Sequence, residues 1–137
     1  MADKDLISNI AAEEVLAETT IGTDTTTLAS IHDNQGFMSL SFLINLTSVT
    51  DGSYTIQVTE GDDPGLSDGV LAAADRLLGT LTFDTVDAGK MLRVGYVGHK
   101  RFARLEIVST GTSTGAVLDV KAIDGHPLEA AVANPSN

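Results

Sequence analysis

The chain has 137 residues, enough for one compact domain, and it contains no cysteine, which excludes disulfides, thiolate metal sites and cysteine nucleophiles. Its 19 acidic residues against 8 basic ones give a formal net charge of -11, which opposes general binding to nucleic acid or to an anionic membrane. Hydrophobic residues at 42% and charged residues at 20% are ordinary for a globular chain, so we expect a folded domain.

The first ten residues, MADKDLISNI, lack the basic start and apolar stretch of a secretory signal, and every apolar run is shorter than the roughly 18 residues of a membrane span. We therefore expect no signal peptide and no membrane partner. Synthesis in a cytosol fits this start, and a virion component would share it because such a protein leaves its host by lysis.

Residues 1–36 differ in composition from the rest of the chain, because acids are spread among small apolar residues and a threonine-rich stretch follows over residues 19–27. Residues 11–17 could make one or two helical turns, but the β-branched threonines favour extended backbone beyond them. We predict an N-terminal arm outside the core that is buried against a neighbouring subunit. The apolar side chains predicted to make this contact are Leu6, Ile7, Ile10, Val15 and Leu16.

The clearest strand begins at Phe37, where apolar and polar residues alternate with a period of two. Residues 50–53 then supply a turn, and a second alternating stretch over residues 54–58 completes the pattern of a hairpin. The side chains predicted to lie in the core from the first strand are Met38, Leu40, Phe42, Ile44 and Leu46.

A polar loop follows, and its acids Glu60, Asp62, Asp63 and Asp68 have two interpretations. They supply enough oxygens for a calcium ion, although their spacing does not match an EF-hand loop. They are also ordinary turn formers in a solvated connection between strands. We predict the turn-forming role, and with it no bound metal.

Further strands are expected over residues 77–83, 91–97, 102–108 and 116–123, with the second and third of these paired as another hairpin. Short strands at a spacing of roughly 8 to 12 residues, joined by glycine and threonine turns, are typical of a sandwich or a barrel. We therefore predict an all-β fold with a single domain, either a β-sandwich or a β-tulip/jelly-roll-like barrel.

Three parts of the chain are predicted on this basis. Residues 1–36 form the extended N-terminal arm, residues 37–125 form the β domain, and residues 126–137 form a short C-terminal tail that has two prolines and no period. No internal repeat is present in the sequence.

No motif supports an enzyme. His32, His99 and His126 are too far apart in sequence to place two ligands on one element, and the chain has no Gly-x-Ser-x-Gly elbow, Walker loop or His-Glu-x-x-His motif. We therefore expect no catalytic residues and no cofactor, and a small enzyme on a β scaffold ranks behind the binding functions.

Basic residues are concentrated in one segment, since five of the eight lie between residues 90 and 104 and no acid occurs between Asp87 and Glu106. If the two strands form a hairpin, Arg93 and Arg104 share its solvated face. This face either neutralises neighbouring acids or docks an acidic protein surface or the acidic arm of another subunit. Nucleic acid is the weaker partner because aromatic platforms are scarce. The candidate docking residues are Lys90, Arg93, Lys100, Arg101 and Arg104.

Several segments carry a resemblance to a known group of proteins. Residues 95–104 read GYVGHKRFAR, residues 110–112 read TGT and residues 125–127 read GHP, with further similarity at residues 60–63 and 75–79. In these segments the chain resembles the capsid decoration, or cement, proteins of tailed bacteriophages. The resemblance covers roughly residues 54–128 and does not include the N-terminal third of the chain.

The resemblance implies a β-sandwich or β-tulip-like subunit, non-enzymatic, that binds the outside of an expanded icosahedral head and strengthens it against internal DNA pressure. Its partners would be the major capsid protein and other copies of itself, commonly as a homotrimer, and its location would be the outer capsid surface of the virion. The alternative is a β-sandwich virion or tail-associated module that binds host-surface carbohydrate. The absence of tryptophan argues against this alternative, because sugar sites usually present aromatic platforms.

Overall fold

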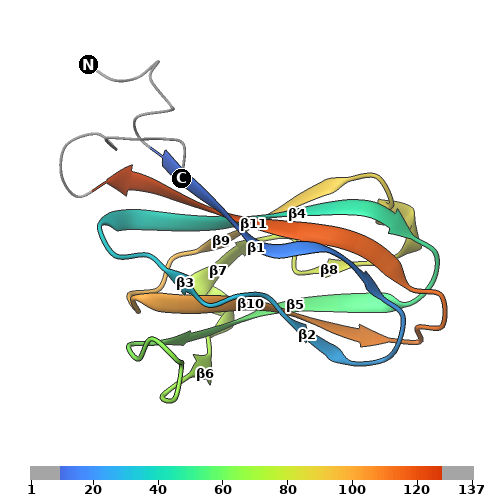
Figure 1. Ribbon diagram of the computed structural model, residues 1–137, viewed down its shortest axis with the longest axis horizontal. Coiled ribbons are helices and arrows are strands. Elements are labelled where there is room, and N and C mark those ends of the chain that lie inside the picture. The colour runs from blue at the N-terminus through green and yellow to red at the C-terminus, as the bar shows by residue number, and fades with distance from the viewer. Residues whose placement is uncertain (1–9, 128–137) are drawn as a thin grey trace.

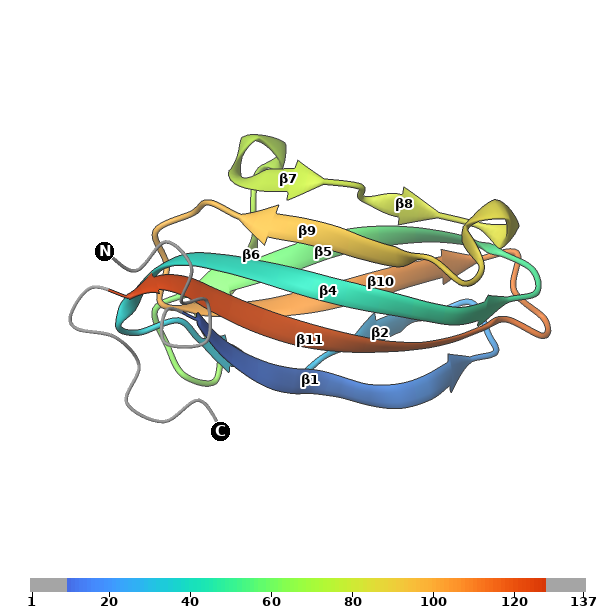
Figure 2. The same ribbon diagram turned by 90° about the horizontal axis from the view of Figure 1, so that it is seen from above.

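The structure is a computed structural model that describes residues 10–127, and residues 1–9 and 128–137 lie outside the described part of the chain. Two antiparallel sheets pack face to face (Figures 1 and 2). The elements in chain order are β1 (Ile10–Ile21), β2 (Thr26–Leu28), β3 (His32–Asp33), β4 (Phe37–Val49), β5 (Ser53–Gly61), β6 (Val70–Leu71), the 3-10 turn η1 (Ala74–Arg76), β7 (Leu77–Gly79), β8 (Thr82–Phe83), the 3-10 turn η2 (Thr85–Asp87), β9 (Met91–Tyr96), β10 (Phe102–Thr110) and β11 (Ala116–Pro127).

Sheet A has five strands in the order β1-β11-β4-β9-β7, and sheet B has the order β2-β10-β5-β6, with β3 also pairing β10 and β8 also pairing β5. Each long strand except β5 is followed by a strand of the opposite sheet, so most connections pass from one sheet to the other. This alternation between two facing sheets is a jelly-roll arrangement. The predicted all-β, single-domain fold is confirmed.

The two predicted hairpins are wrong, because the strands of each pair lie in different sheets. β4 and β9 are neighbours in sheet A, while β5 and β10 are neighbours in sheet B. The period-two pattern identifies strands but does not tell whether a turn joins neighbours in one sheet or crosses between two. The Gly52 turn and the connection after β9 therefore both cross the sandwich.

The core lies between the sheets and is made mainly by β4, β5, β10 and β11. Leu40, Phe42, Ile44 and Leu46 are each 2% exposed or less, as the alternation predicts. Met38, the first member of that predicted face, is 72% exposed; it is the second residue of β4, and the buried side chains of this strand begin at Leu40.

Residues 10–33 belong to the sandwich, which corrects the prediction that residues 1–36 form an arm. β1 pairs with β11 along its length, and the Val15 and Ile21 side chains are buried in the core. Register shifts on both sides of Leu16 interrupt the alternation of inward and outward side chains, so the sequence pattern does not identify this strand. No helix occurs over residues 11–17, which lie within β1.

The boundary predicted for the C-terminal tail is also displaced. β11 continues to Pro127 and pairs there with Phe37, so the strand runs two residues past the predicted end of the domain. Most of the predicted tail, residues 128–137, lies outside the described residues.

One end of the sandwich, which we call the aspartate end, is organised by carboxylates that accept backbone N–H groups. Asp51 accepts N–H bonds from Ser113, Thr114 and Gly115 at 2.8–3.1 Å and a hydroxyl bond from Ser113. These bonds lower the pKa of Asp51 to about 2. Gly115 has φ +90°, and a Cβ there would lie 1.7 Å from the Ile21 carbonyl oxygen, so only glycine fits the crossing into β11.

Candidate functional site

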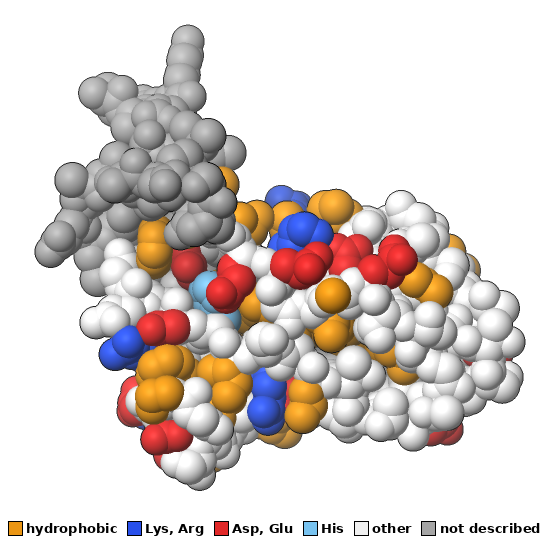
Figure 3. All heavy atoms as spheres, viewed as in Figure 1, with side chains coloured by type: hydrophobic (Ala, Val, Ile, Leu, Met, Phe, Trp, Pro, Cys, Tyr) orange, Lys and Arg blue, Asp and Glu red, His pale blue; other side chains and the backbone are white. Residues whose placement is uncertain are grey.

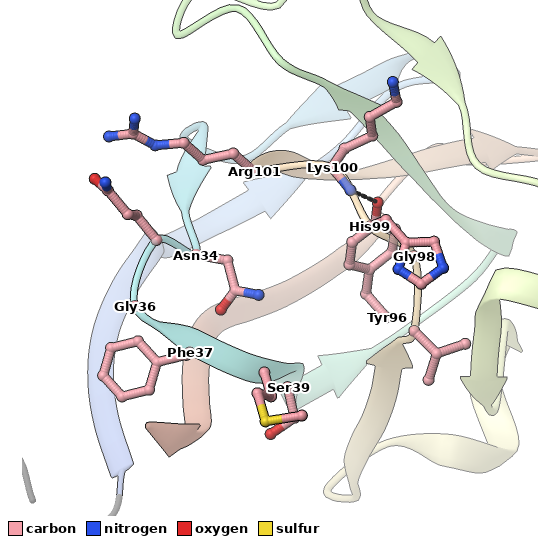
Figure 4. A pocket seen from close by; sticks show the side chains of 12 residues that line it. Asn34, Gly36, Phe37, Ser39, Tyr96, Gly98, His99, Lys100 and Arg101 are labelled. Atoms are coloured by element: carbon pink, nitrogen blue, oxygen red, sulfur yellow. Dashed lines mark hydrogen bonds between the residues drawn. The ribbon is translucent and has the colours of Figure 1, made fainter. Parts of the chain in front are cut away.

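The opposite end of the sandwich, which we call the histidine end, carries a surface hollow between two chain segments. Residues 34–39, which lead into β4, form one wall, and residues 96–101, which connect β9 to β10, form the other. Figure 4 shows the Asn34 carboxamide between the Phe37 ring and the Tyr96 ring. The Asn34 Oδ1 atom is buried and has no hydrogen-bond donor among the described residues. The hollow therefore combines aromatic surface with an unsatisfied amide.

Tyr96 fixes the wall that follows β9. Its hydroxyl donates to a Glu60 oxygen and accepts the Lys100 backbone N–H at 3.2 Å, the bond drawn in Figure 4. Burial raises the pKa of Tyr96, and the bond to Glu60 raises it further, so the phenol stays a donor at any physiological pH. A Cβ on Gly98 would lie 2.3 Å from the Tyr96 hydroxyl oxygen, so glycine is required for this close approach.

Two exposed ion pairs border the hollow. Lys100 Nζ lies 3.0 Å from Asp62, and Arg101 donates two bonds of 2.8 Å to the two oxygens of Asp33. The hydrogen bond from Arg101 holds the pKa of Asp33 below its usual value. The Arg101 guanidinium also lies 4.8 Å from the centre of the Phe102 ring. These contacts join segments that are far apart in sequence and set the shape of this end.

A buried histidine, His32, lies beside the hollow and links the two sheets: it belongs to sheet B, and its partners belong to sheet A. His32 Nδ1 is 2.8 Å from Glu13, and Nε2 is 2.9 and 3.0 Å from the two oxygens of Asp124. His32 and Asp124 are each 4% exposed. Burial opposes the charged imidazole, but the hydrogen bonds to Asp124 and Glu13 outweigh burial and raise the pKa of His32. The acids that surround this cluster contribute to the row of carboxylates that crosses the face in Figure 3.

Sequence reasoning missed this triad of Glu13, His32 and Asp124. The three residues come from β1, β3 and β11, and His32 is 92 positions from Asp124. No local spacing signals the contact, because only the antiparallel pairing of β1 with β11 brings the two carboxylates to one place. A cluster of this kind is found from the three-dimensional structure alone.

The predicted basic patch is not one surface. Arg93 lies on the outer face of sheet A, while Arg104 lies on the outer face of sheet B, because β9 and β10 are in different sheets. The prediction that both share the face of one hairpin is therefore wrong. Their buried neighbours Val94 and Leu105 point into the core between them.

Four of the five predicted docking cations already have acidic partners within the chain. Arg104 lies 2.9 Å from Glu106, which also accepts bonds from Gln57 and Thr59, and Lys90 lies 3.2 Å from Asp87. Lys100 and Arg101 are paired at the hollow, as described above. Arg93 makes no hydrogen bond or ion pair with any residue in the range 10–127. The neutralising interpretation therefore fits four cations, and Arg93 alone of the five stays available.

The apolar residues predicted to contact a partner have different positions. Val15 is 2% exposed in the core of its own chain, and Leu16 packs against that core. Ile10 is half-buried at the start of β1, while Leu6 and Ile7 lie outside the described residues. Val15 and Leu16 are thus removed from the candidate docking set.

The acidic loop between β5 and β6 uses its carboxylates to hold its own backbone. Asp68 accepts the N–H groups of Asp62 and Asp63, and Asp63 accepts those of Gly65 and Ser67. These bonds lower the pKa of Asp63 and of Asp68. Within residues 10–127, no group of three or more His, Cys, Asp or Glu side chains is placed to hold a metal ion, and no helix has the length and apolarity to cross a membrane.

Comparisons with known proteins bear on the fold. No family model matches the chain, and no curated protein matches it. Among solved structures, the chain is similar to the crystal structure of the SPBc2 prophage-derived protein YomS, with a TM-score of 0.52 and 16% sequence identity. The alignment covers 85% of this chain and 92% of that chain. This likeness supports the all-β architecture over almost the whole domain.

Proposed function

We propose that this chain is a tailed-bacteriophage capsid decoration protein, which binds the outer surface of the expanded head and stabilises it without catalysing a reaction. The observation that carries the proposal is the agreement of two independent likenesses. The sequence resembles phage decoration proteins over residues 54–128, and the fold is similar to that of a prophage-derived protein. On this proposal the partners are the major capsid protein and further copies of the chain, commonly in a homotrimer.

The segments that carry the sequence resemblance gather mainly at the histidine end. Tyr96 bonds to Glu60, Lys100 pairs with Asp62, and the Val97 backbone N–H donates to the Arg76 carbonyl at 2.8 Å. Residues 60–63, 75–79 and 95–104 are thereby joined in space, whereas residues 110–112 lie at the aspartate end. We therefore propose the histidine end as the part of the subunit that contacts the head.

Exposed apolar side chains at this end suit a docking role. Met38 is 72% exposed and Val97 is 49% exposed, and both line the hollow. Apolar side chains surrounded by ion pairs match the usual anatomy of a protein interface, with a hydrophobic centre and a polar rim. Arg101 and Lys100, already paired with acids, would form part of that rim.

Binding to purified expanded heads that lack decoration protein tests the proposal. The full chain should co-sediment with expanded heads, and a Met38→Asp/Val97→Asp variant should lose most of its occupancy because charge enters the apolar centre. Val86→Asp is the matched control, since Val86 is 75% exposed in η2 near the aspartate end. Circular dichroism should show that both variants are folded. Absence of wild-type binding to heads would refute the function, and equal occupancy of both variants would refute the docking end.

The symmetry of the bound protein tests the homotrimer. Cryo-electron microscopy of decorated heads should show threefold density at threefold and quasi-threefold positions. Monomers bound singly at the centres of capsomers would contradict this assembly.

Carbohydrate binding by a virion or tail-associated module is the second candidate, and the hollow favours it. Phe37 and Tyr96 supply rings, and Asn34 supplies an amide oxygen that has no hydrogen-bond donor among residues 10–127. Small-ligand sites use this mixture of apolar surface and a few polar groups. A glycan panel separates the two candidates. Binding to one glycan class that Phe37→Ala abolishes, together with no binding to heads, would favour this alternative.

A further inference from the structure

A groove on the outer face of sheet A runs between β7 and β9. Gly95 forms its floor because it has no side chain, and its partner across the strands is Leu78. Leu78 is 57% exposed and Met91 is 59% exposed, so two large apolar side chains border the groove without cover from the described residues. Arg93 lies between Met91 and Gly95 on the same face of β9.

Among residues 10–127, Arg93 is a cation without an acidic partner, and it belongs to a strongly acidic molecule. Lys90, Lys100, Arg101 and Arg104 each lie within 3.2 Å of a carboxylate, whereas no acid in residues 10–127 pairs with Arg93. An exposed guanidinium beside two aliphatic side chains matches a ligand that carries both carboxylates and branched aliphatic groups. The groove therefore favours a ligand that has both acidic and apolar side chains.

We infer that this groove binds residues 3–7 of a second copy of the chain. Their sequence, Asp-Lys-Asp-Leu-Ile, offers two carboxylates to Arg93 and two aliphatic side chains to the exposed Leu78 and Met91. Burial of the aliphatic groups excludes water from the ion pair, and exclusion of water strengthens its attraction. The contact is independent of any capsid and joins copies of the protein in free solution.

A second copy fits better than the same chain. In the strand register of sheet A, Glu14 lies opposite Lys121, Lys121 opposite Leu43, and Leu43 opposite Arg93. Arg93 is therefore three strands away from β1, at the height of a residue in the middle of that strand. For its own residues 3–7 to reach the groove, the chain would have to reverse direction just before Ile10. Asp5 is five residues from Ile10, a span of at most about 18 Å. Four residues along β1 and three strand spacings place Arg93 about 20 Å from Ile10, so Asp5 of the same chain would approach Arg93 only with the segment fully extended.

Charge reversal in the full chain tests the ion pair. Arg93→Glu and the paired change Asp3→Lys/Asp5→Lys should each weaken self-association about tenfold by sedimentation equilibrium, and the three changes combined should recover much of the loss. Leu78→Ser should weaken association as well. Lys90→Glu is the matched control, because Lys90 is already paired with Asp87, and it should leave the association constant within about twofold of the wild type.

Mixing two defective variants distinguishes the two possible occupants. A chain lacking residues 2–9 keeps its groove, and the Arg93→Glu chain keeps its N-terminal segment, so a mixture of the two should associate at least tenfold more tightly than either does alone. A wild type that stays monomeric at every concentration would overturn the inference. The inference would also be overturned if substitutions at Arg93 and Asp5 were coupled only in the free energy of unfolding of a monomer. The occupant of the groove would then be the same chain. Head binding is measured separately, so either result leaves the proposed binding to the capsid to its own test.

Discussion

The two ends of the sandwich are held by different kinds of polar contact. At the histidine end, side chains of opposite charge meet across strands that are distant in sequence, as in the contacts of His32 with Asp124 and of Arg101 with Asp33. At the aspartate end, carboxylates accept backbone N–H groups from one loop, with Asp51 taking three of them. The histidine end therefore adds ion pairs between distant strands to carboxylate–backbone bonds such as those of Asp63 and Asp68, whereas Asp51 at the aspartate end accepts only backbone N–H groups and one hydroxyl.

Because of this difference, the contacts at the two ends titrate in different ranges of pH. The pKa of Asp51 is about 2, so the aspartate end keeps its charges and its bonds until the solution is strongly acidic. The histidine end contains the His32 imidazole, whose pKa is raised above its ordinary value by hydrogen bonds to Asp124 and Glu13, so it keeps its proton to a higher pH than a free imidazole. Rising pH therefore acts first on the contacts of His32, and strong acid acts on those of Asp51.

The largest expected effect comes from the core that both ends share. Phe42, fully buried in β4, lies between them, and Phe42→Ala should lower the free energy of unfolding by about 3–5 kcal/mol. Amide exchange should accelerate at both ends together, because they belong to one cooperative unit. Denaturant curves of variant and wild type measure the loss. Curves that overlay would contradict the core assignment.

Removal of His32 should affect the histidine end selectively. His32→Leu leaves Asp124 buried without a donor, and we expect a loss of about 3 kcal/mol in the free energy of unfolding at neutral pH. His99→Leu is the matched control, because His99 is exposed at the same end, and it should change little. The double variant His32→Leu/Asp124→Leu should recover part of the loss, since no unpaired polar group remains. Equal stability of both single variants would show that the triad contributes nothing.

The triad also makes stability depend on pH in a defined direction. The folded-state pKa of His32 lies above its ordinary value near 6.5, so the folded protein binds the proton more tightly than the unfolded chain. The contribution of His32 is then complete below pH of about 6.5 and disappears as pH rises through the folded-state pKa. Thermal melts from pH 5.5 to 9 should show this decline in the wild type and not in His32→Leu/Asp124→Leu. A decline of equal size in both proteins would assign it to other groups.

The smallest expected effect concerns Asp51, which is solvated. Asp51→Ala should destabilise the loop over residues 111–115 more than the rest of the domain, because four hydrogen bonds disappear while the core is untouched. The pKa is depressed in the folded state, so this contribution is present above the ordinary value near 3.8 and disappears as pH falls through about 2. Amide exchange of Gly115 measures it. Unchanged protection in the variant at pH 5 would exclude the proposed role.

Much of the fold follows from local sequence patterns. Period-two alternation places the strand at Phe37 and identifies the buried side chains from Leu40 to Leu46, because successive side chains of a strand point to opposite faces. The composition of the acidic loop after β5 correctly marks it as a connection between strands. Where the pattern is interrupted, as by the register shifts around Leu16 in β1, the same reasoning predicts an arm in place of a core strand.

The tertiary structure decided what the alternation cannot express. Alternation tells which side chains are buried, but it is the same for two strands in one sheet and for two strands facing each other across a core. The sheet assignment of β9 and β10 therefore came only from long-range pairing, and it places Arg93 and Arg104 on opposite outer faces of the sandwich. His32 meets Asp124 for the same reason, because contacts across 92 residues depend on which strands become neighbours. The strands are a local property of this sequence, whereas its charged sites are a property of its topology.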